Sequence, residues 1–332
     1  MEPLRRIQDY GQLKILSDSR RLAILRLLMA EPMTLSKLGQ VVGEHPARVR
    51  HHLKLLEGAG LVELVDTRVV RGFVEKYYRA KARAFVFQEI ILPVSADRET
   101  VAILGSHDLA LEALAHQLGK KKSFLVELLI LPVGSLEGLI ALRQGVSQLA
   151  GCHLLDAESG EYNLPYVRHI FPDREVSLLT LAYREQGLIV APGNPQQIHS
   201  LQDLGREDVT MVNRNRGSGT RLWLDHQLAQ ISLSPQEVRG YTREVRTHTA
   251  VAEAIRQGKA DTGLGLLASA RQHGLDFIPL FQERFDLAIP QEQIENQRLQ
   301  PLLDYLQCAE FRHVVQGLEG YDTAHTGDQL RP

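Results

Sequence analysis

Residues 34–64 read TLSKLGQVVGEHPARVRHHLKLLEGAGLVEL, and this stretch decides how the first part of the chain folds. Thr34 is a good N-cap and Gly43 a good C-terminal residue for a helix over 35–42. A second helix begins at Pro46, because proline at the first helical position gives up only an N–H that has no helical partner there. Two short helices joined by a glycine-containing turn are typical of a helix-turn-helix, and the sequence predicts one here.

The second of these helices combines a buried stripe with a basic face. Val49, Leu53 and Leu56 form the apolar stripe. A recognition helix enters the major groove of DNA and reads bases with its N-terminal residues. The candidate DNA-reading residues are therefore the polar ones beside the stripe: Arg48, Arg50, His51 and Lys54.

A third helix is predicted just upstream, over 20–30, where apolar residues recur at helical spacing until Pro32 stops the pattern. This region is also basic. Residues 1–84 carry 16 Lys and Arg against 9 Asp and Glu, whereas the remainder carries 22 against 31. A basic N-terminal part followed by an acidic remainder is typical of a DNA-binding domain joined to one that does not bind DNA. A basic face that is only solvated gives the same numbers of charged residues.

The sequence after the helices predicts a β-hairpin wing. Alternating segments at 61–65 and 73–78 flank a polar tip at 66–72. Arg68 and Arg71 at this tip are the candidate contacts to the phosphate backbone of DNA.

Three consecutive segments carry a family likeness: LSDSRRLAILRLL (16–28), TLSKLGQVVG (34–43) and HPARVRHHLKLLEGAGLVEL (45–64). Followed by the wing, they resemble the ArsR-type winged helix-turn-helix. The resemblance implies a homodimer on a pseudo-palindromic DNA operator. Arg48 and Arg50 stand where the family usually has Ser or Thr, so the operator preference does not carry over. Residues 1–100 contain no cysteine, so the thiolate metal site of many members is absent.

Three histidines, His45, His51 and His52, allow two interpretations. They could bind a metal or contact bases; alternatively, they are a helix cap, a groove-facing side chain and a packed side chain. Adjacent helical residues point about 100° apart, and no further ligand stands nearby, so no metal site is predicted.

Residues 85–100 are predicted to link this domain to the next. The surrounding segment, 81–97, contains Phe85, Phe87 and Ile90 and is expected to be a helix or an extended linker. Its apolar residues would either assist dimerisation or pack against the wing.

Beyond residue 100, short apolar strands alternate with polar loops and helices, which predicts an α/β architecture with open sheets. Four strand-to-helix junctions carry hydroxyl residues: Ser106, Ser135, Ser218 with Thr220, and Thr247 with Thr249. Helix N-termini present free N–H groups and the positive end of the helix dipole, so such junctions suit an anion. Each hydroxyl could equally be a cap that only stabilises its helix.

This part of the chain resembles a type II periplasmic-binding-protein fold. The likeness is carried by GSHDLAL (105–111), GSLEGLIAL (134–142), AGCHLLDAESGEYNLPYV (150–167), QGLIVAPGNP (186–195), NRNRGSGTR (213–221), THTAVAEAIRQGKADTGLG (247–265) and LDFIPLFQERFDLAIP (275–290). It is closest to the binding domain of molybdate- or tungstate-linked regulators. The resemblance implies lobe one at 101–184 with 285–332, lobe two at 185–284, and a ligand between them.

The candidate ligand-binding residues follow from these junctions: Ser106, His107, Ser135, Arg216, Ser218, Gly219, Thr220, Thr247 and His248. Arg216 lies at the loop apex and is the first candidate to meet the ligand's charge, with Arg214 and Arg221 as alternatives; all three could instead pair with carboxylates. Cys152 and His153 are adjacent on a predicted strand and point to opposite faces, so they form no dyad, and Cys152 is expected in the core.

The sequence therefore predicts a multi-domain α/β chain: a winged helix-turn-helix over 1–84, a linker over 85–100 and a ligand-sensing domain over 101–332. The expected function is ligand-responsive transcription regulation, with molybdate or tungstate as effector. A molybdopterin-type cofactor or another phosphorylated metabolite is the alternative. An α/β enzyme is a third interpretation, but the sequence has no Walker, HExxH or GxSxG motif.

Composition adds two expectations. Only two cysteines occur, Cys152 and Cys308, which suits a reducing compartment and argues against a disulfide framework. No uncharged apolar run approaches the roughly 18–20 residues that would span a bilayer, and the N-terminus does not read as a signal peptide. A cytoplasmic protein with no membrane partner, no metal and no cofactor beyond its effector is expected.

Overall fold

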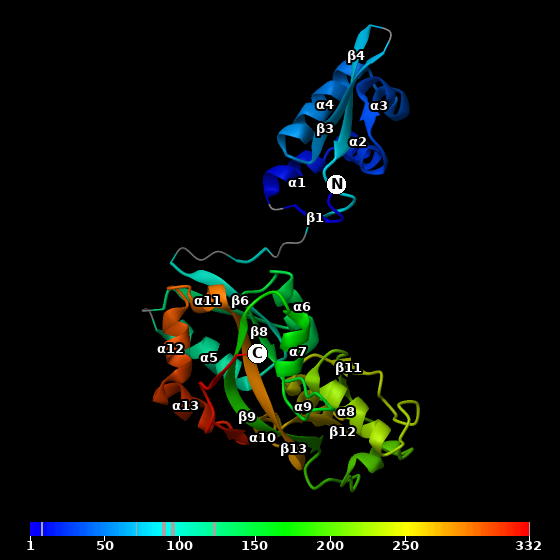
Figure 1. Ribbon diagram of the computed structural model, residues 1–332. Helices are drawn as coiled ribbons and strands as arrows, with labels where there is room; N and C mark the ends of the chain where they lie inside the picture. Colours follow the sequence, from blue (N-terminus) through cyan, green and yellow to red (C-terminus); the bar gives the residue numbers. More distant parts are fainter. Residues whose placement is uncertain (8, 71, 88–90, 94–96, 122–123, 332) are drawn as a thin grey trace. The chain divides into compact units, whose positions relative to one another are not determined.

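The computed structural model describes residues 1–7, 9–70, 72–87, 91–93, 97–121 and 124–331. Contacts between residues divide the chain into two compact units, Met1–Glu89 and Ile90–Pro332 (Figure 1). Each unit has its own hydrophobic core. Within the described residues, no helix has the length and apolar character needed to cross a membrane.

The N-terminal unit contains the predicted helices and a small sheet. Its helices are α1 (Tyr10–Leu16), α2 (Ser19–Ala30), α3 (Leu35–Val42) and α4 (Pro46–Gly58). Its three-stranded sheet has the order β2 (Met33–Thr34), β4 (Phe73–Ala80), β3 (Val62–Val70). The winged helix-turn-helix that the sequence predicts is therefore present.

Local capping explains where these helices begin and end. The Thr34 side chain accepts a hydrogen bond from Lys37 N and starts α3, and Gly43 ends it in the left-handed region, with φ 68°. The His45 side chain accepts from Ala47 N at the start of α4. The buried stripe of α4 then packs into one cluster with residues from α2, α3 and the sheet: Ile24, Leu25, Leu28, Leu38, Val49, Leu53, Leu56 and Val62.

The wing is longer than the sequence indicates. The ladder between β3 and β4 continues to the pair Val70 and Phe73, so most of the predicted polar tip is strand. Val69 and Val74 also pair across the hairpin, and β-branched and aromatic residues extend a ladder readily. Arg71 lies outside the described residues.

The sequence predicts a helix or an extended linker at 81–97. The helix is wrong for the described residues of this segment. β5 (Phe85–Val86) instead pairs in parallel with β1 (Arg5–Arg6) at the N-terminus. Phe85 packs against the core of the N-terminal unit, and the ring of Phe87 lies 6.2 Å from that of Tyr10. Local periodicity missed this strand because its partner is about 80 residues away in sequence. Ile90 lies outside the described residues.

The C-terminal unit is built on one mixed sheet. Its strand order is β12 (Thr262–Leu266), β9 (Val176–Val190), β13 (Asp276–Pro290), β8 (Leu149–Cys152), β6 (Glu99–Gly105), β7 (Val126–Pro132). The other strands are β10 (Asn213–Arg214) and β11 (Glu244–Val245), which pair with each other, and β14 (Tyr321–Asp322) and β15 (Gln329–Leu330), which pair with β9.

Helices cover both faces of this sheet. α5 (Leu109–Lys120), α12 (Gln300–Gln307) and α13 (Ala309–Gln316) share one core cluster, and α6 (Ser135–Arg143) and α7 (Leu164–Ile170) share another. A short helix, α11 (Gln291–Ile294), follows β13, and the 3₁₀ helix η1 (Leu201–Gly205), α8 (Gly219–Gln230), α9 (His248–Arg256) and α10 (Leu267–Gln272) belong to the segment between β9 and β13.

Two long antiparallel strands, β9 and β13, join two lobes (Figure 1). Lobe one contains β6, β7, β8 and the helices around them, and lobe two contains residues 191–275. The predicted lobe boundaries at 184/185 and 284/285 fall in the middle of these strands. Arg184 and Glu283 are direct partners there, so their side chains arise where the chain crosses between lobes.

Candidate functional site

Strand ends bring polar side chains to the interface between the lobes. β6 ends at Gly105, whose φ is 149° and whose Cβ, if present, would collide with the carbonyl oxygen of Gly151. Only glycine fits this turn without strain. The turn delivers Ser106 and His107, which are both buried.

A chain of buried hydrogen bonds starts at Ser106. Its Oγ lies 2.7 Å from His153 Nε2, and His153 Nδ1 lies 2.7 Å from Glu283 Oε2. Burial lowers the pKa of His153, so its ring is neutral near pH 7. Burial opposes the charge of Glu283, but Arg184 and His153 lower the pKa of this carboxyl to about 2. His153 Nδ1 therefore donates to the carboxylate, and Nε2 accepts from the Ser106 hydroxyl.

Arg184 is fully buried between two carboxylates. Its Nε donates to Glu283 Oε1 at 2.6 Å, and its Nη1 donates to Asp108 Oδ2 at 2.5 Å. The hydroxyl of Tyr321 donates to the same Asp108 oxygen at 2.7 Å. Burial disfavours the charge of Arg184, but these carboxylates raise its pKa. Arg184 Nη2 has no hydrogen-bond partner among the described residues.

Arg214 is buried at 1% exposure and forms no salt bridge within the part of the chain that the structure describes. Its Nη2 donates to the carbonyl oxygen of Arg246 at 2.9 Å, whereas its Nε and Nη1 have no described partner. Burial, together with the positive charge of Arg184, lowers the pKa of Arg214 to about 9. The guanidinium remains charged at neutral pH, and a buried unpaired cation is costly. Its surroundings therefore favour an anion.

Two histidines complete what we call the inner cluster: His107, Arg184, Arg214 and His248. The rings of His107 and His248 lie 6.1 Å apart, and Arg184 Nη1 lies 3.4 Å from the carbonyl oxygen of His107. His107 Nε2 lies 2.8 Å from Glu112 Oε1, but His107 Nδ1 and both ring nitrogens of His248 lack a described partner. Burial, followed by the charges of Arg214 and Arg184, lowers the pKa of His248 well below its usual value.

The two lobes touch around this cluster. Asn215 Nδ2 donates to the carbonyl oxygen of Val133 at 3.0 Å, and Leu136 N donates to the carbonyl oxygen of Gly217 at 3.2 Å. A Cβ on Gly219 would collide with the carbonyl oxygen of His153. The inner cluster is thus enclosed by both lobes, and six of its ring and guanidinium nitrogens lack a partner among the described residues.

Comparison with known proteins agrees with this architecture. Residues 116–307 match the model of the PBP superfamily domain. The chain belongs to the PBP superfamily. Residues 16–65 match a helix-turn-helix domain, so a DNA-binding fold precedes the PBP domain.

Two curated relatives cover parts of the chain. YvgK, an uncharacterized protein of Bacillus subtilis (strain 168), is 37% identical over 194 residues, which are 58% of this chain and 62% of YvgK. This chain therefore spans less than two thirds of the length of YvgK. An uncharacterized protein from the 5' region of a ferredoxin 2Fe-2S gene of Clostridium pasteurianum is 34% identical over 105 residues, 31% of this chain and 93% of that protein.

A solved structure shares the fold of the PBP domain. It is a Clostridium perfringens protein named as a phosphate ABC transporter substrate-binding protein and solved with bound phosphate. It is 17% identical, covers 68% of this chain and 99% of its own, and has a TM-score of 0.50. At this identity the likeness concerns the fold alone.

Most of the candidate ligand-binding residues of the PBP domain are buried together with the inner cluster or next to it: Ser106, His107, Ser135, Ser218, Gly219, Thr220 and His248. Two of the candidate residues also cap helices. Ser218 Oγ accepts from Arg221 N at the start of α8, and Thr247 Oγ1 accepts from Ala250 N at the start of α9, so both are helix caps.

The structure does not bring Arg216 into this group. Its side chain is 84% exposed, and its Nε lies 3.8 Å from Glu244 Oε1. The apex of the loop projects the side chain toward solvent, while the alternative Arg214 is buried. Arg221 pairs with Asp225 and Glu244, as the carboxylate interpretation expected.

Sequence reasoning missed four members of the site: Asp108, His153 as a hydrogen-bonding residue, Arg184 and Glu283. The last two interrupt apolar runs, since β9 reads VSLLTLAYREQGLIV and β13 reads DFIPLFQERFDLAIP. A charge inside a strand with buried neighbours was the signal that could have found them.

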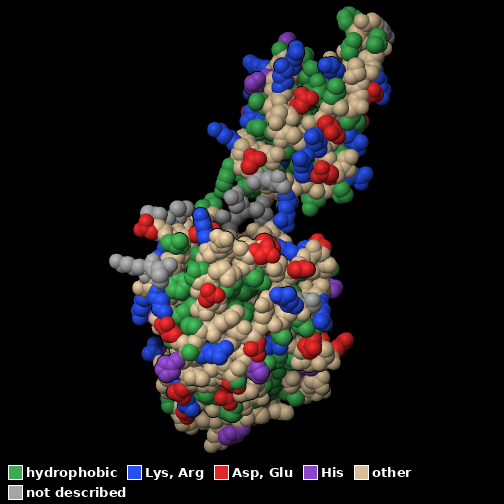
Figure 2. Space-filling model, turned by 60° about the vertical axis from the view of Figure 1, so that its left-hand side comes forward, with side chains coloured by type: hydrophobic (Ala, Val, Ile, Leu, Met, Phe, Trp, Pro, Cys, Tyr) green, Lys and Arg blue, Asp and Glu red, His purple; other side chains and the backbone are tan. Residues whose placement is uncertain are grey.

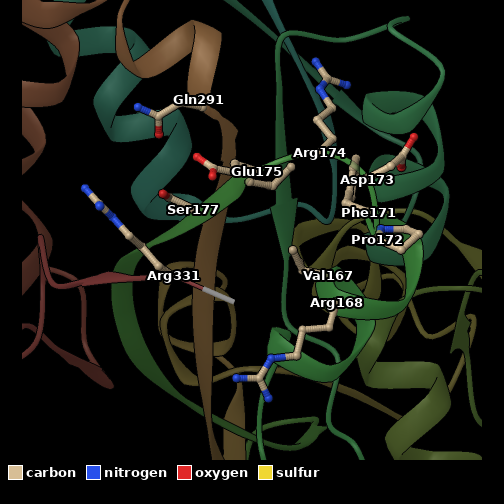
Figure 3. A pocket seen from close by; sticks show the side chains of 11 residues that line it. Val167, Arg168, Phe171, Pro172, Asp173, Arg174, Glu175, Ser177, Gln291 and Arg331 are labelled. Carbon is tan, nitrogen blue, oxygen red and sulfur yellow. The ribbon is translucent and has the colours of Figure 1, made fainter.

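A pocket of about 650 Å³ opens elsewhere on lobe one (Figure 3). It lies beside the end of α7 and the start of β9, and is lined by Val167, Arg168, Phe171, Pro172, Asp173, Arg174, Glu175, Val176, Ser177, Gln291 and Arg331. It shares no residue with the inner cluster. Arg174 is already paired with Glu292, and Asp173 with Arg143, so much of the charge here is satisfied within the protein.

The candidate DNA-reading residues of α4 are all exposed: Arg48, Arg50, His51 and Lys54. Lys and Arg side chains are visible on the N-terminal unit in Figure 2. Arg48 Nη1 lies 3.3 Å from Glu44 Oε2, and in the wing Arg68 Nε lies 2.7 Å from Asp66 Oδ2. Both ion pairs are exposed, so they are weak enough to exchange for phosphate or base contacts.

The three neighbouring histidines of the N-terminal unit serve separate local roles. His45 caps α4, His52 is buried in the unit, and His51 is exposed on the recognition face. Across the described residues, no group of three or more His, Cys, Asp and Glu side chains is arranged to hold a metal ion.

Proposed function

We propose that this protein is a ligand-responsive, DNA-binding transcription regulator whose PBP domain senses a small oxyanion, with molybdate or tungstate as the effector. The observation that carries the proposal is Arg214, a buried guanidinium without a carboxylate partner among the described residues. Arg184 Nη2 and the two histidines of the inner cluster add donors beside it.

Several features favour a compact oxyanion. The unpartnered nitrogens come from four side chains on different elements of both lobes, so they converge on a ligand from several directions. The lobes are in contact around them, which suits a small ligand better than an extended one. The sequence likeness to molybdate- and tungstate-linked regulators selects these two anions among oxyanions.

A molybdopterin-type cofactor or another phosphorylated metabolite is the second candidate. It is supported by the N-terminus of α8, where Ser218, Gly219 and Thr220 lie next to the inner cluster and could receive a phosphate group. Such a ligand would need the lobes further apart than they are here.

The Ser106–His153–Glu283 chain has the hydrogen-bond order of a catalytic triad, but we assign it to binding. Glu283 also accepts from Arg184 and Gln186, so it serves the charge balance of the inner cluster as well as His153. Turnover of a phosphorylated or ester substrate that is lost in Ser106→Ala would contradict this assignment.

The N-terminal unit supplies the output of the regulator. We propose that it forms a homodimer in the cytoplasm on a pseudo-palindromic operator, with α4 in the major groove and the wing on the phosphate backbone. Closure of the lobes on the effector would change DNA affinity through a differential effect on the dimer.

Calorimetric titration of the purified protein with molybdate, tungstate, sulfate and phosphate tests the ligand. We expect tight binding of molybdate or tungstate that is weakened in Ser135→Ala and weakened roughly 10- to 150-fold in Arg214→Met. The exposed variant Arg216→Met is the matched control and should bind as the wild type does. Heat from none of the four anions would exclude the small oxyanion and favour the larger phosphorylated ligand.

A further inference from the structure

The inner cluster lacks negative charge, and a neutral histidine ring there also lacks one N–H donor for an anion. A neutral imidazole has one N–H donor and one bare nitrogen that can only accept. A molybdate or tungstate ion is fully deprotonated near neutral pH and offers only acceptors. A neutral histidine that faces such an ion therefore leaves a buried acceptor without a donor, unless the ring gains a proton.

His248 is the histidine for which this matters most. It is completely buried at the start of α9, and both of its ring nitrogens lack a hydrogen-bond partner among the described residues. Four titratable groups act on its ring: Arg214 on β10, Arg184 on β9, His107 after β6 and His153 after β8.

Burial and these neighbours together hold His248 neutral in the free protein. Burial is the first cause, and the positive charges of Arg214 and Arg184 are the next. A bound dianion reverses the second cause, because it neutralises both guanidinium groups and attracts positive charge to the ring. His153 cannot take this role, because its ring already bridges Glu283 and Ser106.

We propose that binding of a fully deprotonated oxyanion at the inner cluster is coupled to the uptake of one proton by His248. The proton comes from solvent and bonds to the bare ring nitrogen, so the imidazole becomes an imidazolium whose two N–H groups can both donate. The inference rests on the proposed function and adds to it a dependence of effector affinity on pH.

The sign of the pH dependence follows from linkage. The pKa of His248 is low in the free protein and rises in the complex, so between these two values binding takes up a proton. Affinity is then highest at low pH and falls as pH rises, by up to about tenfold per pH unit for one proton. Below the free-state pKa or above the bound-state pKa the dependence disappears.

The test is calorimetric titration of the full chain with sodium molybdate at one pH in two buffers of different ionisation enthalpy. The difference between the two observed enthalpies gives the number of protons taken up per anion. We expect about one for the wild type near pH 7.5. We expect none for His248→Gln, with binding weakened but measurable and less dependent on pH between 7 and 9.

Two matched variants locate the proton. His313→Gln changes an exposed histidine on α13 and should keep the wild-type uptake. His107→Gln removes the other histidine of the inner cluster, and uptake lost there but retained in His248→Gln would overturn the assignment to His248. Molybdate binding without proton uptake in the wild type would overturn the coupling itself. Heat from no oxyanion would overturn the proposed function and this inference with it, which is a distinct result.

Discussion

At the scale of single residues, the environment of an arginine decides its role more than its place in a motif does. Arg214 ends β10 and Arg216 stands two positions further in the loop that follows, yet the first is buried and the second is 84% exposed. The sequence favoured Arg216 because it lies at the loop apex. Burial of a side chain depends on what distant parts of the chain place against it, and local sequence carries no record of that.

Arg214→Met should separate ligand binding from stability. Each charge-assisted hydrogen bond from Arg214 to the anion is worth about 1.5–3 kcal/mol, so its loss should weaken binding roughly 10- to 150-fold. The same change removes a buried unpaired charge, so the free protein should unfold at the same temperature or a higher one. Thermal unfolding with and without molybdate measures both effects. A variant that unfolds far below the wild type but still binds molybdate tightly would show that Arg214 has a structural role instead.

Arg48→Ala and Arg68→Ala should have different effects on DNA binding. Arg48 is exposed on α4, and if it contacts a base its loss should cost about 1–3 kcal/mol at one position of the operator and relax the preference there. Loss of a phosphate contact at Arg68 should weaken binding to all sequences and reduce the slope of affinity against salt by about one. Fluorescence anisotropy over a salt series distinguishes the two. A changed base preference in Arg68→Ala would mean that the wing reads sequence.

At the scale of elements, short-range signals predicted the helices well and long-range pairing poorly. The Thr34 cap, the Gly43 terminus and the proline at 46 place α3 and α4 at the predicted residues, because each signal lies within a few residues of what it controls. The pairing of Arg184 with Glu283 joins positions 99 residues apart. Nothing in either strand alone indicates that the two charges meet, and this is why the centre of the site was missed.

Leu53→Ala should destabilise the N-terminal unit alone. Leu53 is 2% exposed in the core beneath α4, and such a truncation costs about 2–5 kcal/mol. For a unit of this size each kcal/mol lowers the melting temperature by about 4–8 °C. Differential scanning calorimetry should show one transition shifted, and Leu302→Ala in the C-terminal unit should shift the other. Equal shifts of a single transition in both variants would contradict two independent cores.

Gly219→Ala should weaken binding of the effector without destabilising either lobe. An added Cβ would meet the carbonyl oxygen of His153 across the lobe interface. Overpacking of this kind costs about 1–3 kcal/mol, and because only the closed arrangement bears the cost, affinity should fall about 5- to 150-fold. Gly119→Ala, also in a helix but with open space around its Cβ, is the control and should bind normally. Wild-type affinity in Gly219→Ala would mean that the ligand is held with the lobes apart.

At the scale of the whole molecule, the chain combines a helix-turn-helix unit and a PBP domain that have separate cores. This division was predictable, because the change from closely spaced helices to alternating strands and helices is visible in the sequence. What was not predictable is the charge balance at the centre of the PBP domain, where Arg184 meets two carboxylates while Arg214 and His248 have no carboxylate partner among the described residues. That balance arises only when both lobes and the C-terminal strand β14 are in place.

The most direct test of the account is the affinity of the full chain for its operator with and without saturating molybdate or tungstate. The operator is first selected from random DNA by the protein itself, and binding is followed by fluorescence anisotropy at fixed salt. A ligand-responsive regulator should change its DNA affinity at least about fivefold on binding the oxyanion, within the usual range of coupling between two sites. Arg214→Met should bind DNA and respond only at a higher oxyanion concentration than the wild type needs. Equal DNA affinity in both conditions, with the oxyanion demonstrably bound, would contradict the central claim that the PBP domain controls the DNA-binding unit.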